Sequence, residues 1–404
     1  MNIYKYFPVA SDRMGIIWTL SSVKDISVIE FGPAGTTHYA VESIGQLNAE
    51  DSFTIYSTDM DESDITFGSY ERLENSIKEV DVNKNPKYIF VMASSVSSII
   101  GADVTSVCRE LQPSINAKLI SITTGGLKYD YNVGVESALE LIAKNIVKDC
   151  DKKEDSFNII GSNIDSYNFA SDSEEIKRMM KTVFNKDVNT VFTAYTSAEE
   201  LENSSKASLN IVIRKEGLKA AEYMKEKYNI PYIYSKPIGL TQTVKWINDI
   251  KELMNYEVNE VELNKEINLI KKYLFRMRFK LRGLKNKDVA IFGNHDTVLS
   301  MKSFIEELGL NVHRAEVLHG GKINNDEIIV NSGEPSVFKY LKNKELLILM
   351  GDGATLDMKH SSTLDIQISN PNLNAVNIYP YTPYVGLRGC LLLLEKILAV
   401  KEKI

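Results

Sequence analysis

Short apolar runs rich in β-branched residues alternate along the chain with longer stretches whose apolar residues recur at helical spacing. The apolar runs predict strands over 27–31, 53–56, 88–93, 119–122, 157–161, 188–194, 209–213, 232–234, 288–292, 310–317, 327–330, 346–350 and 364–368. The intervening stretches predict helices over 37–47, 69–80, 96–111, 133–147, 173–184, 218–228, 241–254 and 384–400, and one that ends at Leu308. Strands that alternate with helices favour parallel sheets joined by crossover helices.

The predicted elements form three α/β blocks. The polar run 148–155 has no apolar periodicity and suggests a boundary, so we expect a first α/β domain over 1–150 and a second over 151–256. A long connecting helix is expected over 257–285, and a third α/β domain with a C-terminal helix over 286–404. The connecting helix carries basic residues on its other faces, which indicate either a solvated surface or a docking surface for an acidic partner.

Composition narrows the class of protein. The 404 residues are 44% hydrophobic and 25% charged, as in ordinary globular proteins, and the net charge of −7 argues against nucleic acid as a partner. No apolar run is long enough for a membrane span, and residues 1–20 show no secretory signal. The three cysteines lie far apart, with neither a disulfide framework nor a metal spacing, so a cytoplasmic location is expected.

Four turns at predicted strand ends are candidate ligand sites, because open α/β sheets bind ligands there. They are Gly32-Pro33-Ala34-Gly35, Ser94-Ser95 with Gly101, Thr123-Thr124-Gly125-Gly126 and Gly293-Asn294-His295-Asp296. None has the glycine pattern of a dinucleotide or Walker loop. Each turn could bind an anion through backbone N–H groups, or could simply connect a strand to a helix.

A few side chains are weak candidates for chemistry. Among five histidines, His38 and His295 lie next to such turns. The acidic stretch 57–68 contains Glu62 and Asp64, which could supply a proton or a ligand, although a solvated loop is the simpler interpretation. Tyr381 belongs to a group of tyrosines and prolines before the last helix, at 379–384, which either lines a pocket or anchors the loop. No catalytic triad, carboxylate pair or metal-ligand spacing is visible.

Several motifs in order resemble the nitrogenase component 1 family, which includes nitrogenase molybdenum-iron protein subunits, cofactor scaffold proteins and dark-operative protochlorophyllide reductase subunits. The motifs are FGPAGT at 31–36, TDMDESDITFG at 58–68, IFVMASSVSSIIGAD at 89–103, IPY at 230–232 with PIGLT at 237–241, VAIFGN at 289–294 and GLRG at 386–389. Each motif is weak alone, but together they cover nearly the whole chain in the family's order.

This resemblance implies three Rossmann-like domains around a central cleft. It further implies a homologous subunit or a second copy as partner, in a dimer or tetramer, and an ATP-dependent iron protein as electron donor. In the family, cysteines at the subunit interface hold an iron–sulfur cluster. Here the corresponding positions are Thr36, Ser95 and Ser11, and Phe31 replaces a family histidine. Hydroxyl groups are poor iron ligands in such clusters, so we expect no cluster held by this chain alone.

The leading hypothesis is therefore an oxidoreductase subunit that has lost its own cluster ligands and works in a two-subunit reductase complex. A cluster would be shared with or held by the partner, and the cleft would bind a small organic substrate or a tetrapyrrole-like ligand. The residues expected at the ligand are Gly32, Gly35, Thr36, Ser95, Gly125, Gly126 and Tyr381. The alternative is a non-catalytic ligand-binding or scaffold protein that uses the same cleft.

Overall fold

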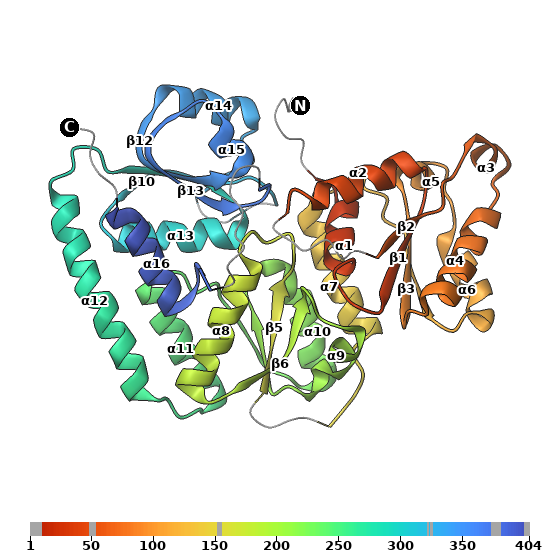
Figure 1. Ribbon diagram of the computed structural model, residues 1–404, viewed down its shortest axis with the longest axis horizontal. Coiled ribbons are helices and arrows are strands. Elements are labelled where there is room, and N and C mark those ends of the chain that lie inside the picture. Colours follow the sequence, from red (N-terminus) through yellow and green to blue (C-terminus); the bar gives the residue numbers. More distant parts are fainter. Residues whose placement is uncertain are drawn as a thin grey trace.

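Three parallel sheets form the framework of the protein (Figure 1). The computed structural model describes residues 10–47, 54–151, 156–320, 323, 326–372 and 381–399. The first sheet has the order β2-β1-β3-β4. Its strands are β1 (Ile26–Phe31), β2 (Ile55–Ser57), β3 (Tyr88–Ala93) and β4 (Lys118–Ile122). Every residue of β1 and β3 is buried, as expected for parallel strands covered by helices on both faces.

The helices of this first part differ from the prediction at several points. They are α1 (Asp12–Leu20), α2 (Ala34–Ile44), α3 (Glu62–Phe67), α4 (Glu71–Lys84), α5 (Ser95–Ile99), α6 (Val104–Leu111) and α7 (Tyr131–Asn145). The single helix predicted over 96–111 is wrong, because Gly101 takes a φ of +74° and separates α5 from α6. The expected solvated loop over 57–68 instead contains α3, which begins with a capping box formed by Asp61 and Asp64.

The second sheet has the order β6-β5-β7-β8. Its strands are β5 (Ser156–Ser162), β6 (Asp187–Thr193), β7 (Leu209–Val212) and β8 (Tyr232–Tyr234). The accompanying helices are α8 (Phe169–Phe184), α9 (Ala198–Glu202), α10 (Leu218–Tyr228) and α11 (Leu240–Met254). Helix α10 ends where Asn229 takes a φ of 53°, two residues before Pro231, as the sequence predicts.

Helix α12 (Glu260–Arg282) leads to the third sheet, whose order is β11-β10-β9-β12-β13. Its strands are β9 (Asp288–Gly293), β10 (Asn311–Val317), β11 (Ile329–Val330), β12 (Glu345–Asp352) and β13 (Ser361–Ser369). Its helices are α13 (His295–Glu307), α14 (Glu334–Asn343), α15 (Gly353–Asp357) and α16 (Gly386–Leu398). The inner face of α12 buries Ile267, Ile270 and Leu274 as predicted, whereas Val261 is exposed.

The hydrophobic cores join the three parts. One core combines α1 and α7 with residues of the second sheet, among them Phe192 and Val212. Another runs from the second sheet through α11 and α12 to the third sheet and α16. Helix α16 lies against α8, α11 and α12, so the closing helix packs beside the second sheet (Figure 1). None of the helices in the described ranges is both long and apolar enough to cross a membrane.

Candidate functional site

The strand orders place one crevice at the carboxyl edge of each sheet. In each sheet the strand order reverses beside the first strand, so that the following strands lie on both sides of it. Ligands of open α/β sheets bind in the crevice at such a reversal. In this chain the crevices lie between β1 and β3, between β5 and β7, and between β9 and β12. The residues at these three points determine what each can bind.

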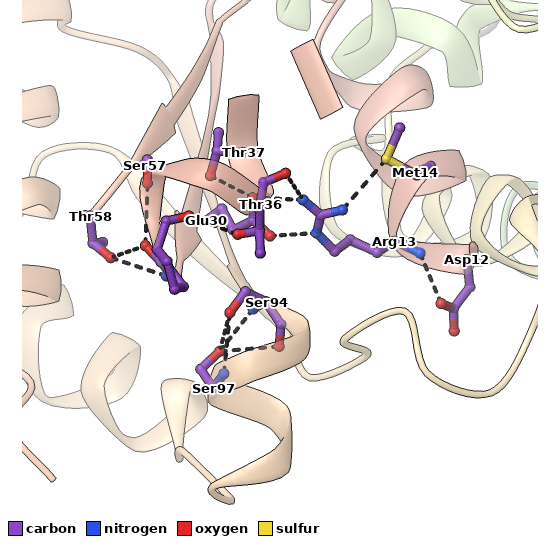
Figure 2. Close-up of polar contacts among 12 residues, drawn as sticks. Asp12, Arg13, Met14, Glu30, Thr36, Thr37, Ser57, Thr58, Ser94 and Ser97 are labelled. Carbon is purple, nitrogen blue, oxygen red and sulfur yellow. Dashed lines mark hydrogen bonds and ion pairs between the residues drawn. The ribbon is translucent and has the colours of Figure 1, made fainter. Parts of the chain in front are cut away.

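Arg13 and Glu30 form a buried ion pair at the carboxyl end of β1. Arg13 extends from α1, and its Nη2 donates to Glu30 Oε2 at 3.0 Å, while its Nε donates to the other carboxylate oxygen (Figure 2). Thr37 Oγ1 also donates to Glu30 Oε2, at 2.7 Å. Glu30 is completely buried and Arg13 is 5% exposed, so each charge is stabilised by its partner in place of water.

The same guanidinium binds the turn that resembles the family's cluster loop. Arg13 Nη2 donates to the carbonyl oxygen of Thr36 at 2.7 Å. Thr36 Oγ1 points back into its own turn and donates to Pro33 O at 2.8 Å. The residue at the expected cysteine position is therefore held by a cation on one side and by its own backbone on the other.

The glycine turns predicted as ligand sites pack against one another here. A Cβ on Gly32 would lie 2.4 Å from Ser94 Cβ, and one on Gly125 would lie 1.9 Å from Ser98 Oγ. Gly126, with a φ of +80°, lies against Ser11 and Arg13. These glycines thus allow close backbone packing. Gly35 differs, since a Cβ there would meet no atom within 4 Å.

The residues around this turn do not fit an iron–sulfur cluster. Thr36, Ser95 and Ser11 offer hydroxyl groups, whereas such clusters need thiolates. Cys108 is buried, which raises the pKa of its thiol to about 11 and keeps it protonated at neutral pH. Cys390 is buried within α16, in the third part of the chain. Within the described ranges, no group of three or more His, Cys, Asp or Glu side chains could hold a metal ion.

A second buried arginine fills the crevice between β5 and β7. Arg214 follows β7, and its Nη1 donates to both oxygens of Asp165, which follows β5, at 3.0 and 2.8 Å. Its Nε donates to Glu216 Oε2 at 2.8 Å. Asn132 of α7 donates to the other oxygen of Glu216 at 2.8 Å, which links this network to the first sheet. Two of the three crevices therefore contain an arginine paired with a carboxylate.

The third crevice, between β9 and β12, opens into a cavity of about 170 Å³ between the three parts of the chain. Helices α1 and α2 and the start of α7 form one side, and Asp165 reaches it from the second sheet. The carboxyl ends of β10, β12 and β13 form the opposite side. This interdomain cavity is the main candidate ligand site.

Aromatic rings form a continuous wall of the interdomain cavity. The rings of Trp18 and Tyr131 meet edge-on with centroids 5.4 Å apart, and those of Tyr131 and His319 do so at 5.1 Å. Tyr131 donates its hydroxyl to Asn294 Oδ1, which follows β9, at 2.7 Å. Burial lowers the pKa of His319 to about 4, so its ring is neutral at physiological pH. Its Nδ1 has no hydrogen-bond partner among the described residues.

Asp352 lies at the opposite side of the cavity, as the last residue of β12. It caps α15 by accepting from Thr355 N at 2.6 Å and is 5% exposed. Burial raises its pKa to about 6, so it is mostly ionised at neutral pH. Unlike Glu30 and Asp165, it forms no ion pair with a described residue. Nearby, Asn370 donates to Asp165 O at 2.9 Å, while its buried Oδ1 has no partner in the described part of the chain.

The other predicted site residues are not among the described residues that line this cavity. His38 is an exposed side chain beside Glu42, and Glu62 is exposed on α3. Asp64 is buried and accepts a hydrogen bond from Arg72 Nε at 2.7 Å. His295 lies beside Asp296, 3.4 Å between Nδ1 and Oδ1, outside the cavity wall. Tyr381 lies in a separate polar groove with residues of α8, while the predicted partners Tyr379 and Pro380 fall outside the described residues.

Sequence reasoning missed the residues that define the cavity and the paired crevices. Arg13 and Trp18 lie on α1, which was not predicted. Asp352 follows an apolar run and precedes Gly353, a strand-end signal that could have added a fifth candidate turn. His319 and Asn370 carry no local signal, because their position depends on how three sheets converge.

Three parallel-sheet domains that converge on one cavity define a multidomain Rossmann-like α/β protein. A solved structure titled "Nitrogenase Cp1 at pH 6.5" has the same fold, with a TM-score of 0.82 and 16% identity, over 99% of this chain and 93% of that one. The model of the nitrogenase component 1 type oxidoreductase family matches residues 11–401. The chain belongs to this family, and the predicted fold of three Rossmann-like α/β domains is confirmed.

Individual relatives point to two branches of the family. One subunit of the light-independent protochlorophyllide reductase of Crocosphaera subtropica is 26% identical over 317 residues, 74% of this chain and 62% of the relative. Nitrogenase iron-molybdenum cofactor biosynthesis protein NifE of Clostridium pasteurianum is 27% identical over 304 residues, 72% of this chain and 64% of the relative. The aligned part is thus less than two thirds of either relative's length.

Proposed function

We propose that this chain is a subunit of a nitrogenase-like reductase complex, that it holds no iron–sulfur cluster of its own, and that it contributes the interdomain cavity as a ligand site. The observation that carries the proposal is the bond from Arg13 to Thr36, because it puts a guanidinium at the turn where the family has a cluster cysteine. Any cluster of the complex would then be held by the partner subunit, and electrons would come from an ATP-dependent iron protein. The complex would work in the cytoplasm.

Exposed apolar side chains around this turn support a partner subunit. They follow the four strands of the first sheet and so gather at its carboxyl edge: Tyr39, Val41, Ile65, Phe67, Ile99, Ile100, Leu127 and Tyr129. Phe67 is 83% exposed and Ile99 is 72% exposed. Large apolar side chains gathered on one surface mark interaction sites. This apolar face would bind a homologous subunit or a second copy, in a dimer or tetramer.

The rival is a non-catalytic ligand-binding or scaffold protein. The small interdomain cavity is equally compatible with this rival and with a reductase subunit, because ligand binding alone needs no electron transfer. A tetrapyrrole-like ligand is much larger than a cavity of about 170 Å³, so it would bind at the apolar face, between subunits. The two functions differ in whether an iron protein docks.

The decisive experiment is anaerobic purification of the tagged chain from its native cells, with iron, sulfide and visible-spectrum analysis. The proposal expects no stoichiometric cluster in the isolated chain, and a co-purifying homologous subunit or second copy that binds an iron protein in the presence of ATP. A stoichiometric cluster in the isolated chain contradicts it. A homodimer that binds no iron protein supports the scaffold function instead.

A further inference from the structure

The three crevices differ in one respect that concerns the ligand. In the first, Glu30 is neutralised by Arg13, and in the second, Asp165 is neutralised by Arg214. In the third, Asp352 has its helix-capping bond but no cation among the described residues. An unpaired buried carboxylate is costly unless something compensates its charge. Asp352 thus differs from Glu30 and Asp165 in that no described arginine pairs with it.

No lysine or arginine occurs among the described residues that line the cavity around Asp352, whereas it has carboxylates at Asp165, Glu316, Glu42 and Glu334 besides Asp352. Asp165 is paired with Arg214. Glu316 is already paired with Arg314. Asn370 Oδ1 and His319 Nδ1 are buried nearby without a described partner, and at least the first can only accept a hydrogen bond. This wall suits a ligand that brings a positive charge and N–H groups.

The remaining wall suits a flat apolar body. Trp18, Tyr131 and Tyr39 supply rings, and Met14, Leu47 and Met358 supply aliphatic surface. Aromatic rings attract organic cations through their electron-rich faces, most strongly where water is excluded. A cavity of about 150 Å³ is known to admit a benzene ring, so the volume of about 170 Å³ fits one ring with a short side chain.

We propose that the interdomain cavity binds a small aromatic organic cation, an arylalkylamine in chemical class, whose ammonium group pairs with Asp352 while its ring packs against Trp18 and Tyr131. The ammonium group does at the third crevice what Arg13 and Arg214 do at the first two. This inference rests on the proposed function for the cavity being a ligand site, and it does not depend on a cluster or a partner subunit.

Three matched probes test the charge of the ligand: phenethylamine, 2-phenylethanol and 3-phenylpropionate. They share a ring and a two-carbon linker and carry a positive, a neutral and a negative head. Titration calorimetry and the fluorescence of Trp18 report binding to the full chain, and the only other tryptophan, Trp246, is buried in a different core. We expect phenethylamine to bind at least about tenfold more tightly than 2-phenylethanol, and 3-phenylpropionate to bind more weakly than either.

The variant Asp352→Asn separates charge from structure. Asparagine keeps the helix cap to Thr355 N and removes only the negative charge. It should weaken phenethylamine at least about tenfold and change 2-phenylethanol less than about threefold. The control Asp357→Asn alters an exposed carboxylate of the same helix and should change the binding of neither probe.

Three outcomes would overturn the inference. They are equal binding of phenethylamine by parent and Asp352→Asn, tighter binding of the anion, and no binding of any probe at millimolar concentration. These results would not contradict the proposal of a subunit without its own cluster, because iron content and partner binding test that proposal separately.

Discussion

The guanidinium of Arg13 donates to the backbone carbonyl of Thr36 over 2.7 Å while it is paired with the buried carboxylate of Glu30. Three segments are joined in this way: α1, the end of β1 and the first turn of α2. The ion pair thus holds the turn at Thr36 through side chains of the protein itself. Its energetic role can be measured directly.

Breaking this pair should be strongly destabilising. Arg13→Met leaves Glu30 ionised and buried without its cation, which lowers the free energy of unfolding by about 3–5 kcal/mol. Glu30→Gln is expected to cost a similar amount, since Arg13 then lacks its counter-ion. The double variant should lose clearly less than the sum, and urea unfolding of all four proteins measures the coupling. Additive losses would show that the two side chains stabilise the fold independently.

Asp352→Asn should stabilise the ligand-free protein above pH 6. The pKa of Asp352 is raised from 3.8 to about 6, so the folded state holds a proton that the unfolded state has released. The favourable contribution is complete below about pH 3.8 and is lost as pH rises through 6. At pH 7.5 the buried charge therefore opposes folding, and its removal should add about 1–3 kcal/mol. Thermal unfolding at pH 5 and 7.5 measures this, and a variant that is less stable than the parent at pH 7.5 contradicts it.

His319 should make the protein sensitive to acid. Its pKa is lowered from 6.5 to about 4, so stability from its neutral ring is complete above pH 6.5 and is lost as pH falls through 4. His319→Phe keeps a ring beside Tyr131 and cannot take up the proton. Between pH 7.5 and 5 the parent should therefore lose about 1–2 kcal/mol more stability than the variant. Parallel pH curves for the two proteins would show that the charge of Asp130, which raises the pKa of this ring, already compensates for its protonation.

Local patterns were sufficient for most of the fold. Strand β3 and helix α10 have the predicted bounds, because a bounded apolar run and an amphipathic stretch ended by Asn229 are signals within a few residues. Helix α1 was missed for the opposite reason. All nine of its residues are buried, among them Asp12, Arg13 and Thr19, so no polar face marks the helical period.

The candidate site was less predictable because it depends on contacts between distant segments. The glycine turn at 32–35 was predicted as a candidate site. Its partner Arg13 lies 23 residues from Thr36, and only its contacts in the folded protein identify it. Asp352 could be recognised as a strand-end residue, yet its importance depends on the finding that no described cation pairs with it. Neither the family resemblance nor the apolar periodicity shows which side chains surround Asp352, because this depends on how the three sheets lie relative to one another.

The apolar face at the carboxyl edge of the first sheet should be required for assembly. Phe67→Glu and Ile99→Glu each put a charge on a side chain that is exposed in the isolated chain and would be buried against a partner. We expect at least about a tenfold loss of the co-purifying subunit or second copy, with unchanged unfolding temperature, because the free chain already exposes both positions. Phe275→Glu is the matched control, since Phe275 is 75% exposed on α12, far from this face (Figure 1). Quantitative pull-down and sedimentation compare the three variants. If Phe275→Glu abolishes assembly while Phe67→Glu does not, the partner binds along the basic helix α12, and the turn held by Arg13 faces solvent in the complex.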